Sequence, residues 1–432
     1  MRALQLKDRT WSGLLLALGF AASVGPSIAY VNVVLNPLAR WVVLLLLVLA
    51  LFVTGRLFSG LRGYAAAFGL PLLVYATFST FWSPLPNLTG LKSVTFLLVA
   101  IAYSAAGAVW AASARRWDSF NVLWPVLILT ILSGLGGLGI ASSKVQMNET
   151  VNLYRGLTAN SNFLGLLALF SLPLPLWYLA RPDTTRGTRR LHIAILIYIG
   201  YLLASSLSRA SLLGAAIMLV IYLLGRGAQR FVVVLAGMAA FSVLLSILFP
   251  ALIDSLVVQF VYKGDPLATS VLASREDNWS LSYEGAAQGG LFGLGYGVSF
   301  GFNTYDVGLA AMEYGREKGN VSLAIIEEVG LLGFGLFVGF IIAVLIQGVR
   351  AAMTASMRED RMLLALMIGS LVGMVANAQF ESWLFSPGGA GTPIFWATVG
   401  MIWTTSRNVV RDKGRRARHL RFAQRANHWA KS

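Results

Sequence analysis

Long apolar runs alternate with short polar loops along almost the whole chain. A helix needs about 20 apolar residues to cross a bilayer, and fewer where flanking polar side chains reach the interface. About twelve runs meet this requirement, and together they predict an all-α, polytopic membrane protein in which residues 1–432 form one integral membrane domain. The runs lie near residues 11–29, 38–53, 64–81, 91–110, 120–140, 162–179, 191–206, 211–224, 231–249, 321–347, 362–378 and 392–405.

The composition agrees with this class. Hydrophobic residues make up 57% of the chain and charged residues 12%, with a mean hydropathy of +0.70, whereas a soluble domain is about 25% charged. There is no cysteine, which excludes disulfides, iron–sulfur clusters and thiolate zinc sites. The three histidines, His192, His419 and His428, are too far apart in sequence to suggest a metal site. We therefore expect no metal and no other cofactor.

The distribution of Lys and Arg predicts the orientation. If the N-terminus is cytoplasmic, most of the 34 basic residues lie inside and most of the 18 acidic residues lie outside, as the positive-inside rule requires. An even number of spans returns the C-terminus to the cytoplasm. The basic cytoplasmic tail, 407–432, is then expected to lie on anionic membrane lipids, and we expect no nucleic acid partner.

One loop on the predicted outer side is much longer than the others, and it covers residues 250–320. A loop of this length is usually functional. Its first part, SREDNWSLSYEGAAQ, predicts a helix with Ser274 as its N-cap and Asp277 three residues later. The following GGLFGLGYGVSFG predicts an irregular, closely packed turn. No strand precedes it, which argues against a nucleotide fingerprint.

Four arginines on the predicted outer side are candidate ligands for an anion: Arg155, Arg209, Arg275 and Arg316. A cation near hydrocarbon is costly, so it usually has an anionic partner. Guanidinium groups bind phosphate with a two-pronged geometry. Lipid diphosphates are concentrated anions in membranes, and we predict that these arginines bind one.

Several short stretches resemble the O-antigen ligase and polysaccharide polymerase superfamily. They are RGLTANSNFLG (155–165), SLSRASLLG (206–214), the Arg275 and Trp279 pair before FGLGYG, and GNVSLAIIEEVGLLG (319–333). Each stretch is weak alone, but their order and their placement around the long loop are fairly specific. The resemblance covers roughly residues 150–405.

This resemblance implies a bacterial inner-membrane glycosyltransferase with a GT-C-like fold and a periplasmic active site. Such enzymes transfer a glycan from undecaprenyl diphosphate to a lipid or glycan acceptor hydroxyl, without a metal and with inversion. Arg209 and Arg275 stand at arginines that the family associates with the donor diphosphate. Gly319 stands where family ligases have a histidine, so another group is expected to take the proton of the acceptor.

The remaining candidates lie in the predicted outer segments, where polar residues can take part in chemistry and aromatic residues can stack on sugar faces. The catalytic candidates are Glu381, which lies in an aromatic setting, and Lys318 and Glu317, which are close to Gly319 in sequence. Carboxylates can act as general bases. The substrate-binding candidates are Asn162, Asn320, Trp279 and Tyr283.

Two other functions are compatible with the pattern. A transporter of an anionic solute would also use many spans and a basic outer site, although we find no internal repeat and few ionisable groups within the spans. A homologue that binds the donor without turnover is the other alternative, because of Gly319. The sequence leaves open ligase against polymerase, the identity of the glycan and the oligomeric state.

Overall fold

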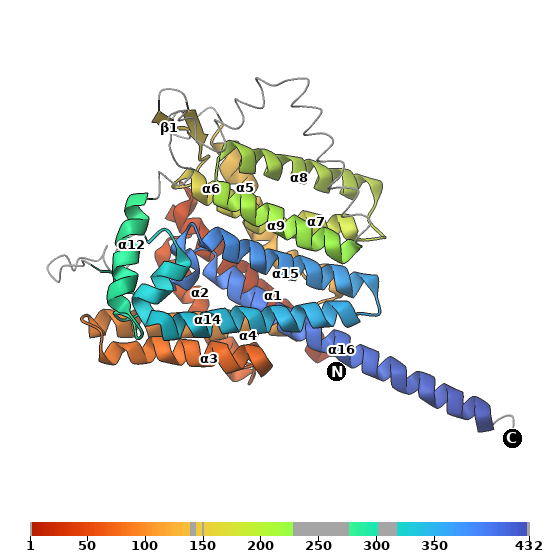
Figure 1. Cartoon of the computed structure of the whole chain (residues 1–432). Coiled ribbons are helices and arrows are strands. Elements are labelled where there is room, and N and C mark those ends of the chain that lie inside the picture. The colour runs from red at the N-terminus through yellow and green to blue at the C-terminus, as the bar shows by residue number, and fades with distance from the viewer. Residues whose placement is uncertain (1, 139–143, 149–150, 228–275, 301–317, 430–432) are drawn as a thin grey trace, which may run out of the picture.

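The computed structural model describes residues 2–138, 144–148, 151–227, 276–300 and 318–429 (Figure 1). The described chain is mostly helical, and its strands pair in one antiparallel hairpin, β1 Lys144–Asn148 with β2 Val151–Tyr154. The helices are α1 Arg2–Val24, α2 Pro37–Val53, α3 Gly63–Phe78, α4 Pro86–Ser113, α5 Trp124–Gly136, α6 Ser161–Ser171, α7 Pro173–Ala180, α8 Arg186–Ser205, α9 Arg209–Arg226, α12 Glu276–Gly289, α14 Val321–Thr354, α15 Arg358–Ala378 and α16 Thr392–Trp429.

The predicted apolar runs fall on these helices wherever the structure describes them, and the run at 231–249 lies outside the described residues. Within the described ranges, six helical segments are long and apolar enough to cross a membrane. The helical fold class is therefore confirmed, while the count of about twelve spans stays a prediction. The six segments are Pro86–Ser113, Arg116–Gly136, Ser161–Ala180, Arg209–Arg226, Val321–Thr354 and Arg358–Ala378.

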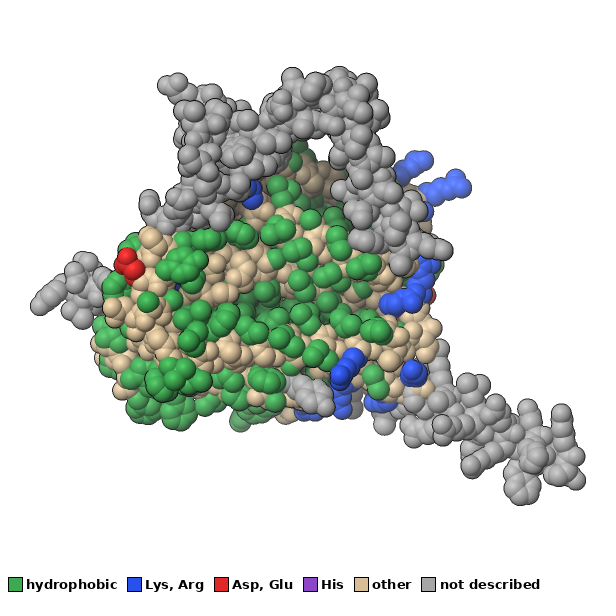
Figure 2. All heavy atoms as spheres, in the orientation of Figure 1, with side chains coloured by type: hydrophobic (Ala, Val, Ile, Leu, Met, Phe, Trp, Pro, Cys, Tyr) green, Lys and Arg blue, Asp and Glu red, His purple; other side chains and the backbone are tan. Residues whose placement is uncertain are grey.

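The helices pack pairwise around a large aromatic and aliphatic core. The most extensive helix–helix contacts join α9 with α15, α4 with α16, and α3 with α14. Trp177, Trp396 and Phe340 are among the largest fully buried side chains. Many apolar side chains also cover the exterior (Figure 2), which is typical of a surface that faces lipid rather than water.

The two chain ends lie at the same end of the bundle (Figure 1). Lys and Arg side chains gather at this end, where α16 leaves the bundle (Figure 2). Asp118 binds Arg9 at 2.7 Å and Arg181 at 3.5 Å, and Arg116 binds Asp360 at 2.8 Å. These pairs connect α1, α7 and α15 to the loop before α5.

The predicted tail has no separate boundary in the structure, because α16 continues as one helix from Thr392 to Trp429. It extends well beyond the other helices (Figure 1). The cytoplasmic location of this tail and its contact with lipid stay predictions.

α14 is interrupted at Gly330, whose backbone has φ 70° and ψ −177°. Residues 290–295 of the glycine-rich loop form hydrogen bonds with the backbone of α14 on both sides of Gly330. Loop amides at Leu294 and Gly295 donate to the carbonyls of Glu327 and Glu328, at 2.8 and 2.9 Å. The amides of Leu331 and Leu332 donate to the carbonyls of Gly290 and Leu291, at 3.1 and 3.2 Å. The loop therefore replaces the two intrahelical hydrogen bonds that the break removes, so these backbone groups stay paired.

Candidate functional site

The stretches selected from the sequence meet at one end of the bundle, opposite the chain ends. We call it the site end: α6, α9 and α14 begin there and α15 ends there. The β1–β2 hairpin and α12 also lie at this end (Figure 1). Side-chain contacts between these segments define the candidate site.

The loop that carries Arg155 is held rigidly in front of α6. Thr158 Oγ1 donates to the carbonyls of Arg155 and Asn160, at 2.6 and 2.7 Å. Asn160 then caps α6 by accepting from the amide of Phe163 at 2.8 Å. Arg155 donates through Nη1 to the carbonyl of Ala159 at 3.2 Å. Its guanidinium is therefore tied to the loop that opens α6.

The hairpin before this loop is anchored through Tyr154. Its hydroxyl donates to the carbonyl of Gly134, near the end of α5. Burial raises the pKa of Tyr154, and the nearby Tyr201 raises it further. The phenol therefore stays protonated and keeps its role as donor.

Arg209 is the first residue of α9 and follows a strained turn. Leu207 adopts φ 49°, a region that non-glycine residues rarely occupy. The turn packs closely on α6, because a Cβ at Gly165 would lie 2.6 Å from Ser208 Cβ. The half-buried Arg209 is therefore presented at the junction of α6 and α9.

A chain of buried polar side chains connects this turn to the end of α15. Ser208 Oγ donates to Ser211 Oγ at 2.9 Å, and Asn377 Nδ2 donates to the same atom at 3.1 Å. Trp383 Nε1 donates to Asn377 Oδ1 at 2.9 Å. Buried networks of this kind fix one arrangement of the elements that they join. Arg209 and the segment after α15 are therefore held in a defined relation.

Glu381 lies in that segment, and the Asn162 side chain binds it. Asn162 Nδ2 donates to Glu381 Oε1 at 2.8 Å. Both residues are half-buried. The structure thus brings together two residues that the sequence analysis selected separately, from α6 and from the turn after α15. An oriented carboxylate of this type can accept a proton from a hydroxyl.

The glycine-rich loop also reaches the segment that follows Glu381. Tyr296 is buried and donates through its hydroxyl to the carbonyl of Phe385 at 2.6 Å. Its ring stacks on Phe96 of α4, with centroids 5.4 Å apart. The loop is therefore joined both to α14 and to the short helix Ser382–Phe385.

Lys318 occupies a buried ion-pair cluster. Its Nζ lies 2.6 Å from Glu328 Oε1 and 3.4 Å from Glu327 Oε2, and it donates to the carbonyl of Val298 at 2.9 Å. The side chain of Lys318 is only 6% exposed and that of Glu327 is fully buried. This arrangement places Lys318 between α14 and the glycine-rich loop, where its charge balances carboxylates.

Backbone amides complete the cluster. The amide of Gly297 donates to Glu328 Oε2 at 2.8 Å, and the amide of Phe300 donates to Glu327 Oε1 at 2.7 Å. These hydrogen bonds give the carboxylate oxygens partners within the buried cluster. The two glutamates thus hold the glycine-rich loop and Lys318 together.

Trp279 of α12 contacts the start of α14 and the end of α15. Its Nε1 donates to the carbonyl of Gly319 at 3.3 Å, and its ring lies 6.2 Å from that of Phe380. Gly319 has φ 61°, and Asn320 caps α14 by accepting from the amide of Leu323 at 3.0 Å. Tyr283, one helical turn after Trp279, is 59% exposed.

Other predicted site residues lie outside the described residues, namely Arg275, Arg316 and Glu317. Their roles, like those of Arg155, Arg209, Glu381 and Lys318, stay predictions. The sequence analysis did not anticipate the polar chain through Ser208, Ser211 and Asn377. A signal was present, because Asn377 ends an apolar helix where a buried amide needs partners. Glu327 and Glu328 gave a similar signal, because two adjacent carboxylates near the start of the apolar run 321–347 require a cation as partner.

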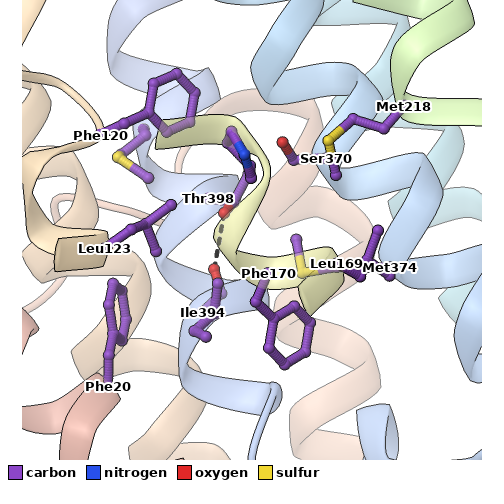
Figure 3. Close-up of a pocket in the computed structure, with 12 residues that line it drawn as sticks. Phe20, Phe120, Leu123, Leu169, Phe170, Met218, Ser370, Met374, Ile394 and Thr398 are labelled. Atoms are coloured by element: carbon purple, nitrogen blue, oxygen red, sulfur yellow. Dashed lines mark hydrogen bonds between the residues drawn. The ribbon is translucent and has the colours of Figure 1, made fainter. Parts of the chain in front are cut away.

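A small cavity lies within the helix core, where side chains of α1, α6, α9, α15 and α16 line part of its wall (Figure 3). Its lining includes Phe170, which contacts Trp383 edge to face at 5.5 Å. Two hydroxyls in the lining donate to their own helices, Ser370 to Leu366 and Thr398 to Ile394. The cavity is therefore apolar and offers no chemistry of its own.

Comparison with known proteins does not extend this description. No protein-family model matches the chain, and no curated protein matches it. One solved structure that it matches belongs to a peptidoglycan synthase complex that coordinates polymerization and crosslinking. The match has 16% identity and a TM-score of 0.44, and it covers 80% of this chain and 97% of that chain. A likeness this weak establishes neither a shared fold nor a shared activity.

Proposed function

We propose that this protein is a membrane glycosyltransferase that moves an oligosaccharide or polysaccharide from an undecaprenyl diphosphate-linked donor to an acceptor hydroxyl. The acceptor is a lipid or a glycan, and the reaction takes place on the periplasmic side of the bacterial inner membrane. The observation that carries the proposal is the Asn162–Glu381 hydrogen bond. It joins α6, which follows the loop of Arg155, to the turn after α15. The buried polar chain ties the end of α15 to the turn before Arg209, which also packs on α6.

The proposed reaction assigns opposite roles to the cations and the carboxylate. The acceptor oxygen attacks the anomeric carbon while the bond from that carbon to the diphosphate oxygen breaks. The diphosphate leaves with the electron pair, and Arg209 and Arg155 stabilise its charge, with Arg275 and Arg316 as further candidates. Glu381 takes the hydroxyl proton, and Asn162 orients its carboxylate. Attack opposite the leaving group inverts the anomeric centre.

Position 319 is a glycine where the ligases of the resembling family have a histidine, and this difference supports a general base elsewhere in the site. Its φ of 61° favours glycine, so a histidine at this position would be strained. Glu381 is connected through neighbouring Phe380 to Trp279, which binds the Gly319 carbonyl. We therefore assign the proton-accepting role to Glu381 rather than to a group at position 319.

The test is transfer by the purified protein in proteoliposomes. The lipid-linked glycan fraction from the producing cells serves as donor, and both transferred glycan and released undecaprenyl diphosphate are measured. We expect both products in equal amounts, and both to disappear in the Glu381→Gln protein. Solute flux without either product would instead favour a transporter, and donor binding without turnover would favour a homologue that has lost catalysis.

A further inference from the structure

Two aromatic rings from distant segments meet at the site end. Trp279 of α12 and Phe380, just after α15, have centroids 6.2 Å apart and planes inclined by 31°. Both side chains are half-buried. The indole N–H of Trp279 donates to the carbonyl of Gly319, which fixes the orientation of that ring. The exposed Tyr283 follows one turn later on the same helix, and residues four apart share a helix face.

Paired polar side chains flank this aromatic pair. Ser322 Oγ lies 2.8 Å from Gln379 Oε1, and Asn162 Nδ2 lies 2.8 Å from Glu381 Oε1. Gln379 and Glu381 are the two neighbours of Phe380 in the chain. Aromatic residues that simply face lipid at a membrane interface do not need planar amide and carboxylate groups on both sides, so this combination argues for a polar, ring-shaped ligand.

We infer that Trp279, Phe380, Gln379 and Ser322 form a binding site for one pyranose ring of the glycan. The inference rests on the proposed function, since it assigns the sugar nearest the reacting bond. One face of a pyranose presents C–H bonds with slight positive charge, which the negative face of an aromatic ring attracts. Its equatorial hydroxyls then reach the planar amide of Gln379 and the hydroxyl of Ser322. Such a site combines an apolar platform with a few oriented polar groups.

The arrangement also places the sugar next to the proposed base. Glu381 follows Phe380 directly in sequence, and its carboxylate is held by Asn162. The proposed sugar site and the proposed base are thus contributed by adjacent residues of one short segment. The glycan site and the diphosphate-binding arginines thus recognise different parts of one donor, and they can be tested separately.

The experiment compares two probes with the protein in nanodiscs. One probe is undecaprenyl diphosphate, and the other is the undecaprenyl diphosphate-linked glycan fraction extracted from the producing cells. We expect Phe380→Leu to weaken binding of the glycan-bearing probe about tenfold and to leave binding of the bare diphosphate unchanged. Phe380→Tyr keeps the aromatic face and should bind like wild type. Phe292→Leu is the matched control, because Phe292 is a 56% exposed aromatic residue in the glycine-rich loop.

The outcomes separate this inference from the proposed function. Equal weakening of both probes by Phe380→Leu would assign Phe380 a structural role and overturn the sugar site. Wild-type protein that binds both probes equally tightly would overturn it too, and the diphosphate role would be unaffected. If wild-type protein binds neither probe, the proposed function itself fails. Gln379→Leu should reproduce the selective loss, since it removes the amide while keeping the size of the side chain.

Discussion

The side-chain amide of Asn162 donates a hydrogen bond of 2.8 Å to the carboxylate of Glu381, from a position 219 residues earlier in the chain. This bond joins the first turn of α6 to the turn after α15. It orients the carboxylate of Glu381 at the end of the bundle where the loop of Arg155 and the first turn of α9, with Arg209, also lie. The predictions below test this relationship and the framework that maintains it.

Glu381 should be essential for transfer but not for donor binding. Glu381→Gln keeps the size of the side chain and removes its capacity to take a proton, so we expect the transfer rate to fall about a hundredfold or more. The affinity for the lipid-linked donor should stay within about twofold of wild type. Transfer kinetics and donor binding on the same preparation provide the measurement, and Glu284→Gln, at an exposed position on α12, is the control. Full activity in Glu381→Gln protein would remove Glu381 from the mechanism.

Arg209 should act on the leaving diphosphate. Arg209→Ala removes a fixed cation from the developing charge, and we expect transfer to fall by about 10²–10³. Arg209→Lys should recover only part of the loss, because an ammonium group lacks the two-pronged geometry. Arg226→Ala, at the other end of the same helix, is the matched control. Equal rates in Arg209→Ala and Arg226→Ala proteins would contradict the assigned role.

The cluster around Lys318 should govern stability. Lys318→Met leaves Glu327 and Glu328 buried without their ammonium partner, which typically costs about 3–5 kcal/mol of unfolding free energy. We expect a lower thermal midpoint in detergent, and partial recovery when Glu328→Leu is added. Lys413→Met, at an exposed position in α16, should leave the midpoint unchanged. A Lys318→Met protein with normal stability and no transfer would instead support a chemical role for Lys318.

Gly330 should not tolerate a side chain. Its conformation is almost restricted to glycine, and a Cβ would collide with the carbonyl of Leu291. We expect Gly330→Ala to destabilise the protein by about 1–3 kcal/mol or more. Gly335→Ala, five residues later in the same helix, meets nothing within 4 Å and should be neutral or slightly stabilising. The difference between the thermal midpoints of the two variants measures the cost of a side chain at the break in α14. Equal midpoints would contradict this account.

The helices were predictable because the bilayer requirement is simple. Any apolar run of sufficient length must satisfy its backbone internally, so runs such as 321–347 and 362–378 had to be helical. The interruption at Gly330 was not predictable in the same way. Its partners are backbone groups of residues 290–295, and the pattern of side chains carries no information about such pairing. The sequence indicated only that this glycine-rich loop would be irregular and closely packed.

The candidate site was predictable in part. Asn162 and Glu381 were each selected because they lie near helix entrances, yet their hydrogen bond depends on how α6 and α15 pack. Lys318 was selected for its closeness to Gly319 in sequence. The structure instead directs its ammonium group to Glu328, ten residues later in α14, and to the carbonyl of Val298 in the glycine-rich loop. These roles depend on contacts between elements that are far apart in the chain. Such contacts cannot be read from a single sequence.

The loop that completes α14 is translated before the helix that it completes. Residues 290–295 leave the ribosome ahead of Gly330, so the donors for the Glu327 and Glu328 carbonyls are already present when this helix enters the lipid. A gene split between codons 300 and 318 would deliver the two halves on separate polypeptides. Without the loop, the amides of Leu331 and Leu332 would bond to the carbonyls of Glu327 and Glu328 within the helix. The second fragment would then enter the lipid as a continuous helix and would adopt the break at Gly330 only after binding the first.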